Sequence, residues 1–119
     1  MPPRLKLAAH GGIAAPEGRG AIIAMLTAAD FEPHLGTRFE LTADGHEEVL
    51  TLTEVKQGRA SPDLARTPFI LIFNGSRSDL LLHPHVRALR HPAFESLEID
   101  IVPTERREDG TFEYQAMFN

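Results

Sequence analysis

The sequence contains no cysteine, which excludes disulfide bonds, thiolate zinc sites, iron–sulfur clusters and cysteine nucleophiles. Long apolar runs are also missing. The longest, residues 70–73, has the length of a strand, whereas a membrane-spanning helix needs roughly 20 apolar residues. The N-terminal residues lack the continuous apolar core of a signal peptide. We therefore expect no transmembrane helix and a cytoplasmic location.

Positive charge is scarce. The 119 residues include 12 Lys and Arg against 17 Asp and Glu, for a net charge of −5, and only Lys6 and Lys56 are lysines. Nucleic-acid binding needs clustered cationic side chains that neutralise phosphates, so this composition argues against it. The length predicts one domain with one modest core.

Residues 1–24 differ in composition from the rest of the chain. They are rich in Ala, Gly and Pro and show neither the helical nor the strand period of apolar residues. We expect a flexible leader there, followed by a single domain over residues 25–119, with Met25 as a candidate alternative start. The apolar pair Ile22-Ile23 is the exception, because it could pair with the edge of a neighbouring sheet.

A short helix is predicted directly after the leader. Thr27 is a good N-cap, and Asp30 stands three residues later, where its carboxylate can reach back to the N–H of the cap. Gly36 supplies the left-handed residue that ends the segment. Within it, we expect Phe31 and Leu35 to be the buried anchors.

From Thr37 onward the apolar residues recur at every second position, which predicts strands. Asp44-Gly45 and Asp109-Gly110 have the composition of tight turns. Val55 is out of phase with the leucines before it, which predicts either a bulge near Glu54 or a strand that is buried on both faces. We expect Pro103 to end the fifth strand. The predicted strands cover residues 37–43, 47–57, 69–73, 85–91, 96–102 and 112–118.

Strands at this spacing with short connections predict a mainly β fold, a small six-stranded antiparallel barrel or sandwich with a short N-terminal helix. A parallel α/β sheet is excluded, because no connection is long enough for repeated crossover helices. The large inward Leu, Ile and Phe side chains should fill the interior. We therefore expect no cofactor and no ligand inside the barrel.

Core and turn residues recur in a recognisable string: LTAADF at 26–31, LGTRF at 35–39, RTPF at 66–69, LIF at 71–73, LRHP at 89–92, LEIDIVP at 97–103 and YQAMFN at 114–119. This string resembles a bacterial family of small domains of unknown function, and the resemblance covers roughly residues 25–119. Where the family pattern has a glycine after the His-Pro turn, this chain has Glu95. The resemblance carries no chemical motif, but it implies an association with phage-tail-like or surface assemblies.

The candidate metal ligands are His83, His85 and His91. Alternate residues of a strand point to the same side, so the imidazoles could converge on zinc, with one position left open to water. Pro84 disturbs the strand, and no carboxylate shares the spacing. His-Pro is common in turns, which favours the interpretation that His91 ends a strand while His83 and His85 are exposed.

Two acidic clusters are weaker candidates. Asp30, Glu32 and His34 could form an acid–base pair, but capping already accounts for Asp30, and we expect the other two side chains to face solvent. The second cluster lies on the last hairpin: Glu98, Asp100, Glu105, Glu108, Asp109 and Glu113. These carboxylates are the outward half of a regular alternation, which predicts a solvated face that resists aggregation.

These observations favour a non-enzymatic protein-interaction or accessory module that binds another protein or associates with itself. The alternative is a metal-dependent enzyme that uses His83, His85 and His91. The sequence indicates no small-molecule substrate, and no membrane or nucleic-acid partner.

Overall fold

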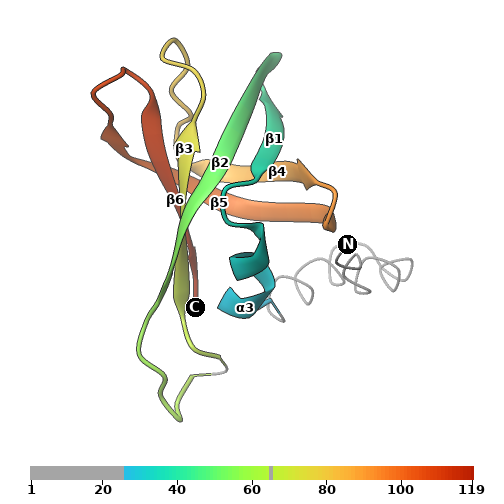
Figure 1. Ribbon diagram of the computed structural model, residues 1–119, viewed down its shortest axis with the longest axis vertical. Helices are drawn as coiled ribbons and strands as arrows, with labels where there is room; N and C mark the ends of the chain where they lie inside the picture. The colour runs from blue at the N-terminus through green and yellow to red at the C-terminus, as the bar shows by residue number, and fades with distance from the viewer. Residues whose placement is uncertain (1–25, 65) are drawn as a thin grey trace.

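The computed structural model describes residues 26–64 and 66–119. Their six strands form a closed antiparallel barrel in the order β1-β2-β3-β6-β5-β4 (Figure 1). The mainly β prediction is thus confirmed, as a barrel. The elements are α3 (Ala28–Phe31), η1 (Glu32–His34), β1 (Arg38–Ala43), β2 (His46–Gln57), β3 (Phe69–Gly75), β4 (His85–His91), β5 (Phe94–Arg106) and β6 (Phe112–Phe118).

The barrel has a sharp corner, at which β4 and β5 run across the direction of β2, β3 and β6 (Figure 1). The corner lies within β5. Its first part, up to Ile101, pairs with β4, and from Val102 onward it pairs with β6. A long strand that changes partners in this way joins two crossed layers without a separate connection. The predicted leader with its pair Ile22-Ile23 lies outside the described residues, as does the candidate start Met25.

Local sequence signals place most of the turns. Asp44 and Gly45 both have positive φ, 51° and 81°, as a two-residue hairpin turn matching the strand twist requires. The predicted bulge is present, because the β2–β3 register shifts between Leu52 and Glu54. At the start of α3, the Thr27 N–H donates to Oδ2 of Asp30 over 2.8 Å, which confirms the cap.

Two predictions about buried anchors and strand ends are wrong. Leu35 is 45% exposed, and the neighbouring His34 is buried in its place, because the short 3-10 turn Glu32–His34, which contains Pro33, places His34 on the inner side. Pro103 does not end β5 but pairs with Tyr114 of β6. Pairing between β5 and β4 ends at Ile101, so Pro103 lies in an edge stretch, where its missing N–H removes no ladder bond on the β4 side.

Aromatic rings close the lower end of the barrel, where α3 lies in Figure 1. Phe31 is fully buried, with ring centroids 5.0–5.8 Å from those of Phe69, Phe94 and Phe118. Arg66 lies over Phe69 and Phe118, at 5.6 and 5.4 Å from the ring centroids. Its guanidinium also donates to the carbonyls of Leu26 and Asn119. One side chain therefore joins both ends of the domain to this aromatic cluster.

Inward side chains from all six strands belong to one buried cluster with α3. Buried Tyr114 connects this cluster to the loop between β3 and β4, because its hydroxyl accepts a hydrogen bond from the N–H of Leu82 over 3.0 Å. Burial raises the pKa of Tyr114, which keeps the phenol neutral at physiological pH. No helix within the described ranges is long and apolar enough to cross a membrane.

Truncation of Phe31 should show how much the aromatic cluster contributes to stability. We expect Phe31→Ala to lower the free energy of unfolding by about 3–5 kcal/mol, because it leaves a cavity among three rings. The matched control is Leu35→Ala, which should change it by less than about 0.5 kcal/mol because Leu35 is exposed. Urea denaturation measures both, and equal effects would contradict this account of the lower end.

Candidate functional site

The seam between β1 and β4, where the barrel closes, is its least paired part. The β1–β2 ladder runs through all six residues of β1, from Arg38 to Ala43. By contrast, β1 and β4 pair at one position only, Glu40 with Arg90. Backbone hydrogen bonds contribute little to closure here, so side chains must hold the two strands together.

Arg90 spans the outside of this seam. Its guanidinium lies 2.9 Å from Oε1 of Glu47 and 4.0 Å from Oε1 of Glu40, and it donates to Oγ1 of Thr42 over 3.3 Å. Thr42 in turn donates to Glu47, and together these contacts hold the pKa of Glu47 below its usual value. All four side chains are exposed, so solvent screens this network.

His91 holds the inside of the same seam. The Ala93 N–H donates to Nδ1 of His91 over 3.0 Å, so Nδ1 must be an acceptor and the neutral ring carries its hydrogen on Nε2. Nε2 then donates to Oγ1 of Thr37 over 2.9 Å, and the Thr37 hydroxyl donates to the carbonyl of His34 over 2.6 Å. This chain joins the end of β4 to η1 and to the residue before β1.

The structure brings His34 and His91 together, although the sequence placed them in different candidate sites. Their ring centroids are 4.9 Å apart, edge to face, and both side chains are buried. Our expectation that His34 faces solvent is therefore wrong. The first acidic cluster does not assemble around it either: Asp30 caps α3, and Glu32 is exposed.

The histidines proposed as metal ligands do not converge. His83 and His85 are exposed before and at the start of β4, whereas His91 is buried at its other end. Six residue steps along the strand lead from His85 to His91, a span of roughly 20 Å. Within the described ranges, no group of three or more His, Cys, Asp or Glu side chains is arranged to hold a metal ion.

Glu48, which the sequence did not single out, is a carboxylate only 1% exposed on β2. Its Oε1 accepts the N–H of Val49 and both the N–H and the hydroxyl of Ser76, at 2.8, 3.1 and 2.5 Å. Its Oε2 accepts the N–H of Arg77 at 3.4 Å. Glu48 thereby fixes the start of the loop between β3 and β4. Glu48, Leu50 and Leu52 are alternate residues of one strand and therefore point to the same side. This pattern in the sequence could have predicted that Glu48 is buried.

Gly75 leaves little space for a side chain beside this carboxylate. A Cβ on Gly75 would lie 3.0 Å from Oε2 of Glu48 and 3.0 Å from Cε2 of Tyr114. Both contacts are tighter than most real contacts of a Cβ atom, so a side chain at position 75 would require Glu48 or Tyr114 to shift.

The outer surface of β4 exposes apolar side chains. Val86 is 54% exposed, and Ala88 on the same face is also exposed. Because the pairing with β1 is confined to Arg90, the edge of β4 over residues 85–88 has no neighbouring strand on that side within the described ranges. An unpaired edge presents a row of backbone donors and acceptors to solvent.

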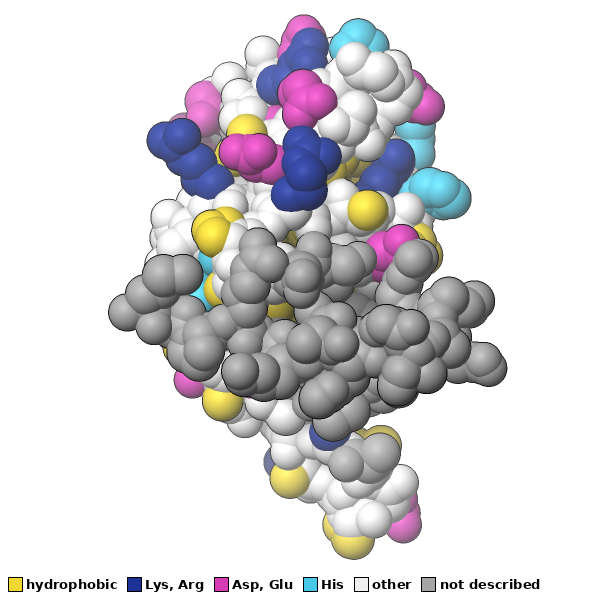
Figure 2. Space-filling view, turned by 90° about the vertical axis from the view of Figure 1, so that its right-hand side faces the viewer, with side chains coloured by type: hydrophobic (Ala, Val, Ile, Leu, Met, Phe, Trp, Pro, Cys, Tyr) yellow, Lys and Arg dark blue, Asp and Glu magenta, His cyan; other side chains and the backbone are white. Residues whose placement is uncertain are grey.

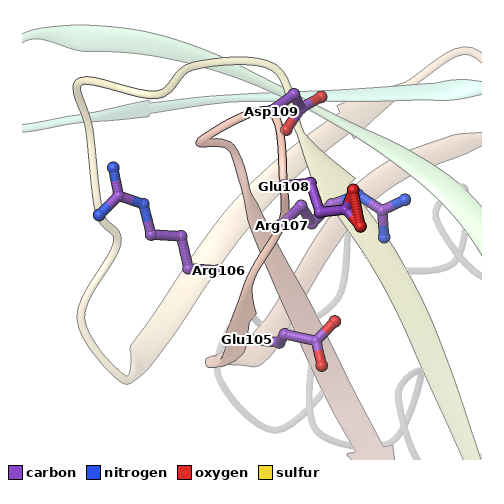
Figure 3. A pocket seen from close by; sticks show the side chains of 5 residues that line it. All are labelled: Glu105, Arg106, Arg107, Glu108 and Asp109. Atoms are coloured by element: carbon purple, nitrogen blue, oxygen red, sulfur yellow. The ribbon is translucent and has the colours of Figure 1, made fainter.

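A surface hollow of about 640 Å³ lies at the tip of the β5–β6 hairpin, lined by Glu105, Arg106, Arg107, Glu108 and Asp109. In Figure 3, Arg106 extends away from the others. All five residues are exposed and come from one hairpin, so no second element encloses the hollow. Arginines lie among the carboxylates, and the predicted acidic face of this hairpin therefore carries both signs of charge.

The face toward the viewer in Figure 2 also mixes charges. Above the grey residues, basic, acidic and histidine side chains lie side by side, with single hydrophobic side chains between them. No basic patch of the kind that binds nucleic acid stands out on the visible part of this face.

A protein-family model, described as a domain of unknown function (DUF6916), matches residues 26–118. No curated protein and no solved structure matches the chain significantly. The family match agrees with the resemblance found in the sequence and covers every strand of the barrel.

Glu48→Gln should test the role of the buried carboxylate. The amide keeps one acceptor oxygen but loses the charge and places a donor opposite another donor. We expect the free energy of unfolding to fall by about 1–3 kcal/mol. Glu54→Gln on the exposed side of β2 is the matched control, with an expected change below about 0.5 kcal/mol. Similar values for the two variants in chemical denaturation would refute this role of Glu48.

Proposed function

This chain belongs to that family of domains of unknown function, and we propose that it is a non-enzymatic interaction module that binds an extended segment of a partner protein along the edge of β4. The proposal depends on the observation that β1 and β4 pair at a single position, Glu40 with Arg90. Pairing with β5 engages β4 over its whole length, whereas β1 reaches it only at Arg90.

The edge of β4 lacks the usual protection against a further strand. Exposed edges are commonly blocked by charged side chains, especially lysine, or by proline. The residues His85–His91 include neither lysine nor proline. Arg87 is folded back and donates to the carbonyl of His83 over 2.9 Å, and Arg90 is turned toward Glu47. Among the strands that the structure describes, none pairs with residues 85–88 on this side, and this stretch is therefore the proposed docking edge.

An added strand would obtain its affinity from main-chain hydrogen bonds and its specificity from alternate side chains. Val86 and Ala88 offer the apolar contacts on the outer face. Asp100 lies directly opposite Val86 on β5, so on this face of the sheet a partner segment is favoured that combines apolar with basic side chains. The resemblance noted above supports a role in a phage-tail-like or surface assembly, in which such an edge would join neighbouring subunits.

Val86→Lys tests this function without disturbing the core, because Val86 is exposed and faces Asp100, an acidic cross-strand neighbour. We expect the variant to lose at least about tenfold in affinity for a purified partner, corresponding to about 1.4 kcal/mol. Met117→Lys is the matched control, since Met117 is 60% exposed on β6, and it should bind like the wild type.

The partner for this measurement is the protein that copurifies with the wild type and crosslinks through a photoreactive residue at position 86. Light scattering of the purified protein measures its molar mass and thereby tests whether the partner is a second copy of this chain. A partner that binds Val86→Lys as tightly as the wild type would overturn the proposal. Selective loss on Met117→Lys would place the interface on β6 instead.

A further inference from the structure

His34 and His91 form a buried pair where η1, β1 and β4 meet. Their exposed fractions are 8% and 9%. The ring centroids of Phe39 and Phe94 lie 4.3 and 5.5 Å from that of His91, so apolar rings cover much of the imidazole surface. A positive charge on His91 would lose most of its hydration in these surroundings.

Protonation of His91 would also break a hydrogen bond. Nδ1 is the acceptor for the N–H of Ala93, and the added proton would turn it into a second donor facing the first. Ala93 belongs to the two-residue turn between β4 and β5, since His91 pairs directly with Phe94. The turn would therefore have to open or the imidazolium would have to leave its site.

No described carboxylate compensates a charge on His91. From η1, the titratable group that faces it is His34, which adds like charge. From β1 the facing side chain is Phe39, while Arg38 and Glu40 are exposed on the other side; on β4, Arg90 is also exposed. From β5, the side chain that faces His91 is Phe94. Burial and the charge of His34 both lower the pKa of His91, and the attraction of a cation to the Phe39 ring does not reverse this direction.

We propose that the His34–His91 pair is an acid-sensitive latch on the barrel. With neutral rings, His91 joins the end of β4 through Thr37 to η1 and β1. When His91 takes up a proton, the bond from the Ala93 N–H is lost, and an imidazolium that leaves its buried site also gives up its bond to Thr37. The single backbone pair Glu40–Arg90 and the exposed contacts of Arg90 are then left to hold the seam. The inference does not depend on whether β4 binds a partner.

The direction of the pH effect follows from linkage. The unfolded histidine titrates near 6.5, and the folded one titrates lower. The open state therefore binds more protons between these two values. The stabilising effect of neutral His91 is complete above about pH 6.5 and decreases as the pH falls through this window. One proton allows the opening equilibrium to rise by up to about tenfold per pH unit.

Hydrogen exchange of the full chain between pH 7.5 and 5, corrected for intrinsic exchange rates, tests the latch. We expect protection to fall in residues 34–43 and 85–94 but not in 69–75 and 112–118, which distinguishes opening of the seam from global unfolding. His91→Asn should abolish the acid response, because the side-chain oxygen of Asn still accepts from Ala93 and does not titrate. His85→Gln, at an exposed position on the same strand, should respond like the wild type.

A histidine NMR titration of the wild type provides a second measurement if His91→Asn fails to fold. We expect the imidazole of His91 to titrate below 6.5, and to move toward 6.5 in His34→Phe, which keeps an aromatic ring but removes the second charge. Titration of His91 at or above 6.5, or an equal loss of protection in β3 and β6, would overturn the proposal.

Discussion

Closure of the barrel between β1 and β4 depends on side chains far more than on the backbone ladder. Only Glu40 and Arg90 pair there, whereas every other neighbouring pair of strands shares a longer register. A barrel removes its edges only where closure is complete. Among the described strands, part of β4 therefore has a neighbour on one side only. The contacts across the incomplete seam decide how firmly the sheet holds its shape.

The two ends of the barrel differ in the interactions that close them. At the lower end the burial is apolar, with Phe31 among other phenylalanine rings and Arg66 over them. At the upper end a buried carboxylate, Glu48, organises a loop through backbone N–H groups. Such a charge is tolerated in a core only when its lone pairs are satisfied. The loop before β4 is thereby ordered, and it fixes where the exposed edge begins.

The seam also connects the proposed interaction with the proposed acid response. His91 lies next to Arg90, so one strand carries the inner and the outer contact of the closure. Solvent and salt screen the outer contact, whereas the inner one is shielded but depends on a neutral imidazole. An edge that accepts a further strand and a latch that loosens the same region are compatible, because both use the least paired part of the sheet.

Periodicity and turn chemistry predicted much of the fold. The strands, the Asp44-Gly45 turn, the bulge near Glu54 and the Thr27 cap were all visible, because each depends on neighbouring residues. Errors arose where a residue's surroundings come from elsewhere in the chain. Pro103 continues a strand because the pairing with β4 stops at Ile101, and His34, which the 3-10 turn places inward instead of Leu35, meets His91 there.

The candidate site was much less predictable than the fold. Strand parity indicates that Glu48 and His91 point inward, but it says nothing about what they meet there. By itself, the sequence determined which side of each strand is apolar and where the chain turns, since these follow from periods of two residues and from local backbone preferences. Only the tertiary structure decided that His91 pairs with His34 rather than with His83 and His85, because barrel closure sets which distant residues become neighbours.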